Sequence, residues 1–359
     1  KVITSFGELG GKMQLNSYEA KPMNIGKASE TTAQEQAKIE VAALYRKQYD
    51  NKHYRYSKEE AEVQSDTCKI PMKVNTYSKH LKKMEGVCTY SDIKLNGTRL
   101  MVIDGQAYSK AGKPEHLKVG HLKTAIDMLN ELGVATFDAE VYCHGISLQR
   151  IRAAFTKPVR TDKELSKMTT NPREDALNLE LHVFDIPVEG QTYDQRMTTR
   201  GMLRAVVEDL GLEDVIKFTV RAGETRTQEE RTALRKKVEA LGYEGLMHIK
   251  PDSMYEFGKR TYSILKDKDR IDGEALVLDC TSDKSGQGVL HMRTSDSLGG
   301  ATFKGKMKGD AESRDYNEQC KFIGKWVTFQ YEELSDKGVP TKPTVCETRV
   351  CDSRGEPLE

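Results

Sequence analysis

The stretch YSDIKLNGTRLMV, residues 90–102, places one lysine between an apolar run and a glycine turn, with an arginine at the start of a second apolar run. Lys94 comes directly before Leu95, Asn96 and Gly97, and Arg99 follows the glycine by two residues. A glycine between two strand-like runs indicates a turn, so Lys94 is expected at the mouth of a hairpin-like turn. Taken alone, such a stretch is usually an exposed loop, and only its flanking segments can indicate more.

The composition is that of a soluble protein with two or three domains. The chain has 359 residues, of which 31% are charged and 37% hydrophobic, and this length is enough for more than one core. No apolar run approaches the roughly 20 residues that a membrane helix needs. We therefore expect no membrane contact.

The charge and the cysteine content bear on nucleic-acid binding and on the redox compartment. A net charge of +1 neither favours nor excludes nucleic acid, because binding needs a basic surface and not a basic total. The seven cysteines include no CxxC pair, and the first residues are too polar for a signal peptide. Free thiols in a reducing cytoplasm are expected, with no zinc site.

Three parts differ in pattern. Residues 1–65 are predicted to form a small α+β unit, with a strand in 12–21 and a helix in 29–50 that begins at a capping box of Thr32 and Glu35. Residues 66–269 mix strands and helices in an α+β layout with a mostly antiparallel sheet. In residues 270–359 the helices stop, and short strands with glycine turns predict a small barrel such as an OB-fold.

The expected elements follow from periodicity and glycine turns. In the middle part, strands are predicted in 98–105, 134–142, 179–187 and 243–249, and helices in 118–133, 193–211 and 227–242. In the last part, strands are predicted in 272–280, 288–296, 300–308 and 324–334.

Short segments with reactive residue types recur in order along the middle part. They are KLNGTR at 94–99, SKAG at 109–112, DAE at 138–140, HVFD at 182–185, EG at 244–245 and KDK at 266–268. In this order they resemble the motifs of the covalent nucleotidyltransferases, which include ATP-dependent DNA ligases, RNA ligases and mRNA-capping guanylyltransferases. The segments EVYCHGISLQ and EGLMHIKPDSMYEFGKRTYSILKDKD are most similar to DNA ligases of bacteriophages and large DNA viruses.

The resemblance implies an adenylation domain with antiparallel sheets, followed by an OB-fold. It implies an enzyme, an ATP-dependent DNA ligase that uses ATP and Mg²⁺. The amine of Lys94 would attack the ATP α-phosphate, pass AMP to a DNA 5′-phosphate, and let the 3′-hydroxyl seal the nick. A free lysine is protonated at neutral pH, with a pKa near ~10.4. Positive charge from Arg99, Lys266, Lys268 and a divalent metal would therefore be needed to favour the neutral amine.

The resemblance also implies the residues of the nucleotide site. Arg99 would hold the ribose or a phosphate, and Ser109 and Lys110 would lie against the sugar and the DNA phosphate. Phe184 could stack on adenine, although a phenylalanine in a strand more often lies in a core. Ile93, next to the nucleophile, belongs to the same nucleotide-binding set.

Charged residues complete the predicted site. Glu140 and Glu244 would bind Mg²⁺, and Glu140 would also contact the ribose hydroxyls. Lys266 and Lys268 point to one face of a strand and would hold an anion between them. Arg349, by a looser match, would orient the pyrophosphate, with a charge at the barrel rim as the alternative.

Two positions depart from the family pattern. Asn96 stands where an aspartate is usual, which removes one charge that could help to deprotonate Lys94. The basic residue usual five places after Glu244 is Ile249 here, and Lys250 follows it on the other face of a strand.

The expected partner is nicked double-stranded DNA, bound by a monomer in the cytoplasm of a bacterial or phage-infected cell. Residues 1–65 resemble an accessory DNA-binding unit, with a packing appendage as the alternative. An RNA ligase, a capping guanylyltransferase and an inactive nick-binding protein remain alternative functions.

Overall fold

The computed structural model describes residues 1–7, 10–52, 54–60, 70–166, 168, 170–310 and 312–358, without the side chains of 50–52. It contains two compact units, one formed by Lys1–Glu62 with Arg270–Glu359 and the other by Val63–Asp269. The division into 1–65, 66–269 and 270–359 stays a prediction, and its first boundary, like Cys68, lies outside the described residues. The six described cysteines are free thiols, as expected.

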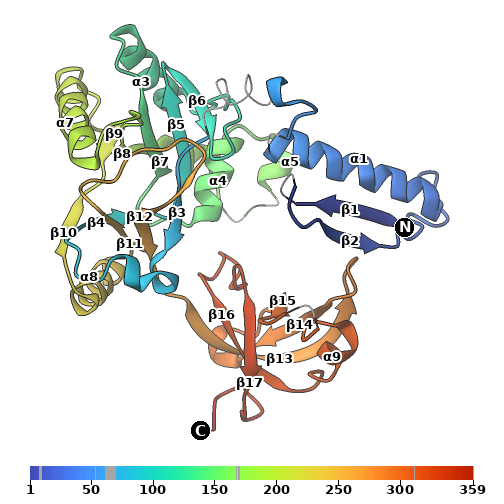
Figure 1. The fold of residues 1–359 in the computed structure, drawn as a ribbon. Helices are drawn as coiled ribbons and strands as arrows, with labels where there is room; N and C mark the ends of the chain where they lie inside the picture. Colours follow the sequence, from blue (N-terminus) through green and yellow to red (C-terminus); the bar gives the residue numbers. More distant parts are fainter. Residues whose placement is uncertain are drawn as a thin grey trace. The chain divides into compact units, whose positions relative to one another are not determined.

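The N-terminal residues form a hairpin and a long helix (Figure 1, blue). Strand β1 (Val2–Phe6) pairs antiparallel with β2 (Gln14–Tyr18), and α1 spans Ala33–Lys52. The capping box is confirmed: the Thr32 backbone N–H donates to Glu35 at 2.9 Å, and the Glu35 N–H donates to the Thr32 hydroxyl at 3.2 Å. The predicted strand and helix are confirmed, whereas β1 was not predicted.

The unit Val63–Asp269 contains two five-stranded sheets, both mostly antiparallel, as expected. The β4 sheet has the order β10 (Arg221–Thr225), β4 (Thr89–Lys94), β11 (Gly245–Ile249), β12 (Arg260–Asp267) and β3 (Lys73–Thr76). The β5 sheet has the order β6 (Gln106–Ser109), β5 (Thr98–Ile103), β7 (Phe137–Tyr142), β8 (Glu180–Asp185) and β9 (Ile216–Phe218). Neighbouring strands are antiparallel except in the pairs β12–β3 and β8–β9.

Helices cover the outer faces of these sheets (Figure 1). The α-helices of this unit are α3 (Gly120–Glu131), α4 (Leu148–Thr156), α5 (Asp162–Leu165), α6 (Pro172–Leu177), α7 (Tyr193–Asp209) and α8 (Gln228–Ala240), with 3-10 turns at Tyr77–Lys79 and Leu81–Lys83. Leu100 and Val102 of β5 pack in one core with α3, α4 and α7, whereas Met101 packs with Ile249 and Ile264 of the β4 sheet. The two sheets therefore meet through the alternate face of β5.

The turn after Lys94 is not a hairpin turn. β4 and β5 belong to different sheets, and residues 95–97 carry the chain from one to the other. The apolar runs on both sides of the turn do lie in strands, but an apolar run does not indicate which strands pair.

The C-terminal residues form the expected closed barrel, consistent with an OB-fold. Its order is β13 (Ile271–Ser282), β14 (Gly288–Thr294), β15 (Thr302–Met307), β17 (Thr344–Thr348) and β16 (Trp326–Tyr331), with a 3-10 turn at Asp296–Leu298. The expectation that helices stop after residue 269 is wrong, because α9 spans Tyr316–Cys320. In the part of the chain that the structure describes, none of the helices has the length and apolar character needed to cross a membrane.

Candidate active site

Three of the predicted residues meet where strands of the β4 sheet end. Lys94 is the last residue of β4, Glu244 directly precedes β11, and Lys268 directly follows β12. One oxygen of the Glu244 carboxylate accepts a hydrogen bond from the Lys94 ammonium group, and the other accepts one from Lys268 at 2.7 Å. The side chains are 21%, 16% and 14% exposed, so all three can still be reached from solvent.

Two glycines allow these strand ends to approach closely. A side chain at Gly97 would collide with the Val141 carbonyl and lie 2.8 Å from Glu140 Cγ. Gly245 has a φ of +147°, and a side chain there would collide with the Asp267 carbonyl. The glycines that follow Lys94 and Glu244 are thus required by close backbone contact.

The Glu244 carboxylate is held in its charged form. Burial raises its pKa, but the charges of Lys94 and Lys268 outweigh burial and leave the pKa below its ordinary value. An anion was expected between Lys266 and Lys268. The Glu244 carboxylate is such an anion for Lys268. Lys266 lies on β12 and is half-buried, like Lys268, while Asp267 between them is buried, as the expected alternation requires.

The pKa of Glu140 is shifted in the opposite direction to that of Glu244. It lies on β7, in the sheet that faces Lys94, and burial raises its pKa to about 7. The nearby Lys94 and Arg99 lower the pKa and Glu244 raises it. No hydrogen bond to its carboxylate occurs among the described residues, so a bound cation would stabilise it.

The pair Glu140 and Glu244 fits Mg²⁺, which proteins commonly hold by one or two carboxylates together with substrate phosphates. No group of three or more histidine, cysteine, aspartate or glutamate side chains suited to a metal occurs among the described residues. An ion at this place would thus depend on oxygen atoms from the nucleotide.

Arg99 is engaged by the protein itself. Its Nε and Nη2 donate to the two oxygens of Asp138 at 2.9 and 2.5 Å, and its Nη1 donates to the Met72 carbonyl at 2.7 Å. Its guanidinium lies 5.3 Å from the centre of the Phe184 ring. Any contact with a ribose or phosphate would therefore be made by an arginine already fixed in place.

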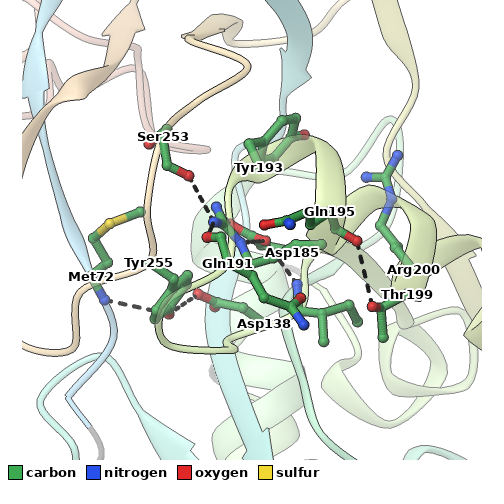
Figure 2. Close-up of polar contacts among 12 residues, drawn as sticks. Met72, Asp138, Asp185, Gln191, Tyr193, Gln195, Thr199, Arg200, Ser253 and Tyr255 are labelled. Atoms are coloured by element: carbon green, nitrogen blue, oxygen red, sulfur yellow. Dashed lines mark hydrogen bonds and ion pairs between the residues drawn. The ribbon is translucent and has the colours of Figure 1, made fainter.

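Figure 2 shows polar contacts around Asp138, the carboxylate that Arg99 contacts, and around Asp185. Tyr255 donates a hydrogen bond to Asp138 at 2.6 Å and lies 3.4 Å from the Met72 nitrogen. Arg196, which is fully buried, donates to both oxygens of Asp185 at 2.7 and 3.0 Å. These residues connect the two sheets.

Two further nucleotide-binding candidates lie nearby. Phe184 is half-buried and is not part of the described core, which leaves a face for stacking. Ile93 packs against the core, and its N–H donates to the Val220 carbonyl at 3.0 Å.

Ser109, Lys110 and Arg349 are not brought into this group by any contact described above. Ser109 ends the edge strand β6, and its hydroxyl accepts a hydrogen bond from the Lys113 backbone at 3.3 Å. Lys110 and Arg349 are exposed, and Arg349 belongs to the other unit. Their predicted roles continue to depend on the resemblance.

Sequence reasoning missed Asp92, which lies two residues before Lys94 on β4 and is 3% exposed. It accepts a hydrogen bond from the Tyr193 hydroxyl at 2.6 Å and lies 3.4 Å from Arg221. Strand periodicity alone puts it on the Lys94 face and could have identified it. Ile249, which stands where the family usually has a basic residue, is 6% exposed, so its side chain is part of the core.

The middle part of the chain is similar to a known protein family. A family model described as the ATP-dependent DNA ligase domain matches residues 71–268. No curated protein sequence matches the chain.

Solved ligase structures are also similar. A Lig E DNA ligase has a TM-score of 0.62 at 19% identity, over 78% of this chain and 99% of that one. A structure named Pmar-Lig_Pre has a TM-score of 0.62 at 20% identity, over 82% and 71%. The Chlorella virus DNA ligase-adenylate has a TM-score of 0.42 at 21% identity, over 80% and 100%. At these identities the first two indicate a shared fold.

Proposed function

Because the chain belongs to the family of ATP-dependent DNA ligases, we propose that it seals nicks in duplex DNA through an AMP adduct on Lys94 and a 5′-adenylylated DNA. The observation that supports this proposal is the contact of Lys94 and Lys268 with the two oxygens of Glu244. It holds a primary amine at a strand end, partly exposed, beside a second ammonium group.

In the first step the Lys94 amine attacks the α-phosphorus of ATP. The new bond joins Nζ to phosphorus, the bond from phosphorus to the bridging oxygen breaks, and pyrophosphate leaves with that electron pair. The amine must first lose its proton to solvent, and the Glu244 carboxylate that is hydrogen-bonded to it holds it in place. Lys268 then stabilises negative charge that develops on the phosphate.

In the later steps the DNA 5′-phosphate displaces Lys94 from AMP, and the 3′-hydroxyl then displaces AMP. Glu140 and Glu244 are the residues that would hold Mg²⁺, which neutralises phosphate charge when bound. Arg99, fixed by Asp138, would present its remaining surface to the nucleotide, with Phe184 beside it.

The barrel would hold the DNA through its phosphates, without reading the bases. Lys304 on β15 and Lys308 just after it are exposed. Such contacts should make DNA binding weaken steeply as salt is added.

One assay tests the proposal against its alternatives. The full-length protein is incubated with Mg²⁺ and with ATP, GTP or NAD that carries a label in the nucleotide to be transferred, and the protein is then examined for covalent label. Label from ATP alone, followed by sealing of nicked DNA, is the expected result. Label from GTP would indicate a capping-type enzyme, sealing of RNA in place of DNA would indicate an RNA ligase, and no label would contradict catalysis altogether.

A further inference from the structure

A buried polar network lies on the face of the β4 sheet opposite Lys94. His248 on β11 is 0% exposed, and its two ring nitrogens are both engaged. Nδ1 lies 2.9 Å from the Ser91 hydroxyl of β4, and Nε2 lies 3.1 Å from the Asp267 carboxylate of β12. Ser91 is also 2.9 Å from the Thr225 hydroxyl of β10, so four neighbouring strands are connected in one layer.

The hydrogen bonds of this network have a defined direction. Burial lowers the pKa of His248, so the ring is neutral at neutral pH and carries one proton. A carboxylate only accepts, which places that proton on Nε2 and leaves Nδ1 to accept from Ser91. Ser91 in turn accepts from Thr225. Each ring nitrogen therefore has one partner of the correct type, and the Ser91 hydroxyl has two.

Each member of the network lies close in sequence to a residue of the active site. Ser91 is three residues before Lys94, an odd spacing that puts the two on opposite faces of β4. His248 lies on β11, the strand that Glu244 precedes, and Asp267 lies between Lys266 and Lys268. The strand ends that carry the reacting groups are thus connected from behind.

We propose that Ser91, His248 and Asp267 form a positioning network for the adenylylation of Lys94, because they fix β4, β11 and β12 to one another beneath the site. The proposal rests on the proposed function, since its measure is the formation of the AMP adduct. The other charged groups around His248 belong to α8: Arg235 lies 3.4 Å from Asp267, and Arg231 donates to Thr89 at 3.3 Å. The Tyr77 ring packs edge-on against the His248 ring, with the two ring centres 4.9 Å apart. These neighbours would remain in a His248 variant, so its effect would report the imidazole contacts.

The test compares four full-length proteins: the parent, His248→Leu, His248→Gln and His121→Leu. Glutamine can place an amide N–H near the Nε2 position and donate to Asp267, whereas leucine cannot. His121 on α3 is the control, because its imidazole makes a single hydrogen-bond contact, 2.8 Å to the Leu179 carbonyl, outside the network. Adduct formation is followed in a single turnover over a range of ATP concentrations.

We expect His248→Leu to lower the rate constant at saturating ATP by about 10-fold, since small displacements of reacting groups are costly. The ATP concentration at half-maximal rate should change by less than about 2-fold. His248→Gln should recover most of the rate, and His121→Leu should match the parent. Simple loss of folded protein would lower the amplitude of adduct formation and leave the rate constant unchanged.

A normal rate constant for His248→Leu would overturn the positioning network while leaving the proposed function intact. A reduced rate that glutamine does not restore would also overturn it, because the Asp267 contact would then be unimportant. An unreactive parent would instead contradict the proposed function and the network with it.

Discussion

The two sheets of the unit Val63–Asp269 hold their charges in different ways. In the β5 sheet, Asp138 and Asp185 each offer both carboxylate oxygens to one arginine, Arg99 and Arg196, and both carboxylates are almost fully buried. At the ends of the β4 sheet, Glu244 instead shares its oxygens between two ammonium groups that solvent can reach.

This difference separates charges that maintain structure from charges that are available for chemistry. A guanidinium that binds a carboxylate through two parallel hydrogen bonds is fixed in orientation and always protonated. A lysine ammonium is a point charge on a flexible stem and can lose its proton. The β4 sheet therefore presents exchangeable contacts where the β5 sheet presents rigid ones.

The largest expected effect is that of removing the nucleophile. Lys94→Ala should abolish the AMP adduct completely, because Lys94 is the proposed attachment point of AMP, and Lys268, the other lysine on Glu244, is assigned to stabilising phosphate charge. The variant should still seal DNA that already carries AMP at its 5′ end, if slowly. Mass spectrometry of the protein after incubation with ATP measures the adduct. A variant that still gains one AMP at a single site would contradict the assignment of Lys94.

The second prediction compares one carboxylate from each sheet. Asp185→Ala leaves the buried Arg196 without its partner and should lower the free energy of unfolding by about 3–5 kcal/mol. Glu244→Ala should cost only about 1 kcal/mol, yet slow adduct formation by about 100-fold, as expected when a group that stabilises charge in the site is lost.

Urea denaturation and single-turnover labelling measure both quantities on the same preparations. If Glu244→Ala proves as destabilising as Asp185→Ala, the site charges are structural and the distinction between the sheets fails.

The sequence predicted the parts of this comparison better than their arrangement. Apolar alternation indicated β5, β7, β8 and β11, and the resemblance of the motifs to those of nucleotidyltransferases suggested Lys94, Glu140 and Glu244 as site residues. Alternation did not indicate that β4 and β5 lie in different sheets, because a period of two specifies which face of a strand is buried and not which strand it pairs with. The pairing of Arg99 with Asp138 joins positions 39 residues apart and leaves no local pattern.

Short elements were missed for similar reasons. β17 has only one buried residue, Val345, within a five-residue strand, so its alternation is too weak to recognise. The helix α9 has five residues and is shorter than any periodic pattern that could reveal it. Asp92 was missed because it precedes Lys94 and lies outside the KLNGTR segment.

The third prediction tests how much the two parallel hydrogen bonds from Arg99 to Asp138 contribute to stability. Arg99→Lys keeps the charge but loses the parallel hydrogen bonds to Asp138, and it should lower the free energy of unfolding by about 1–2 kcal/mol. The exposed pair of Lys123 and Asp127 is the control, since Lys123→Ala should change stability by less than about 0.5 kcal/mol. Equal effects in urea denaturation would show that the buried fork adds nothing.

The last prediction concerns Glu140, the carboxyl group that lies between the two sheets without a hydrogen-bond partner among the described residues. The pKa of Glu140 is about 7 in the folded protein, against an ordinary value of 4.5. Between these values the folded state keeps a proton that the unfolded state releases, so stability is lost as the pH rises towards 7. Glu140→Gln removes this titration. The difference in unfolding free energy between variant and parent should therefore shift in favour of the variant by roughly 1–2 kcal/mol from about pH 5 to pH 8.

Urea denaturation without metal at the two pH values measures this shift, and the contributions of all other groups cancel in the difference. Added Mg²⁺ should reduce the shift, because a cation would stabilise the ionised Glu140 of the parent alone. A pH-independent difference would mean that Glu140 is already ionised in the folded protein, in which case it resembles the fixed carboxylates of its own sheet more than a group prepared to bind a metal.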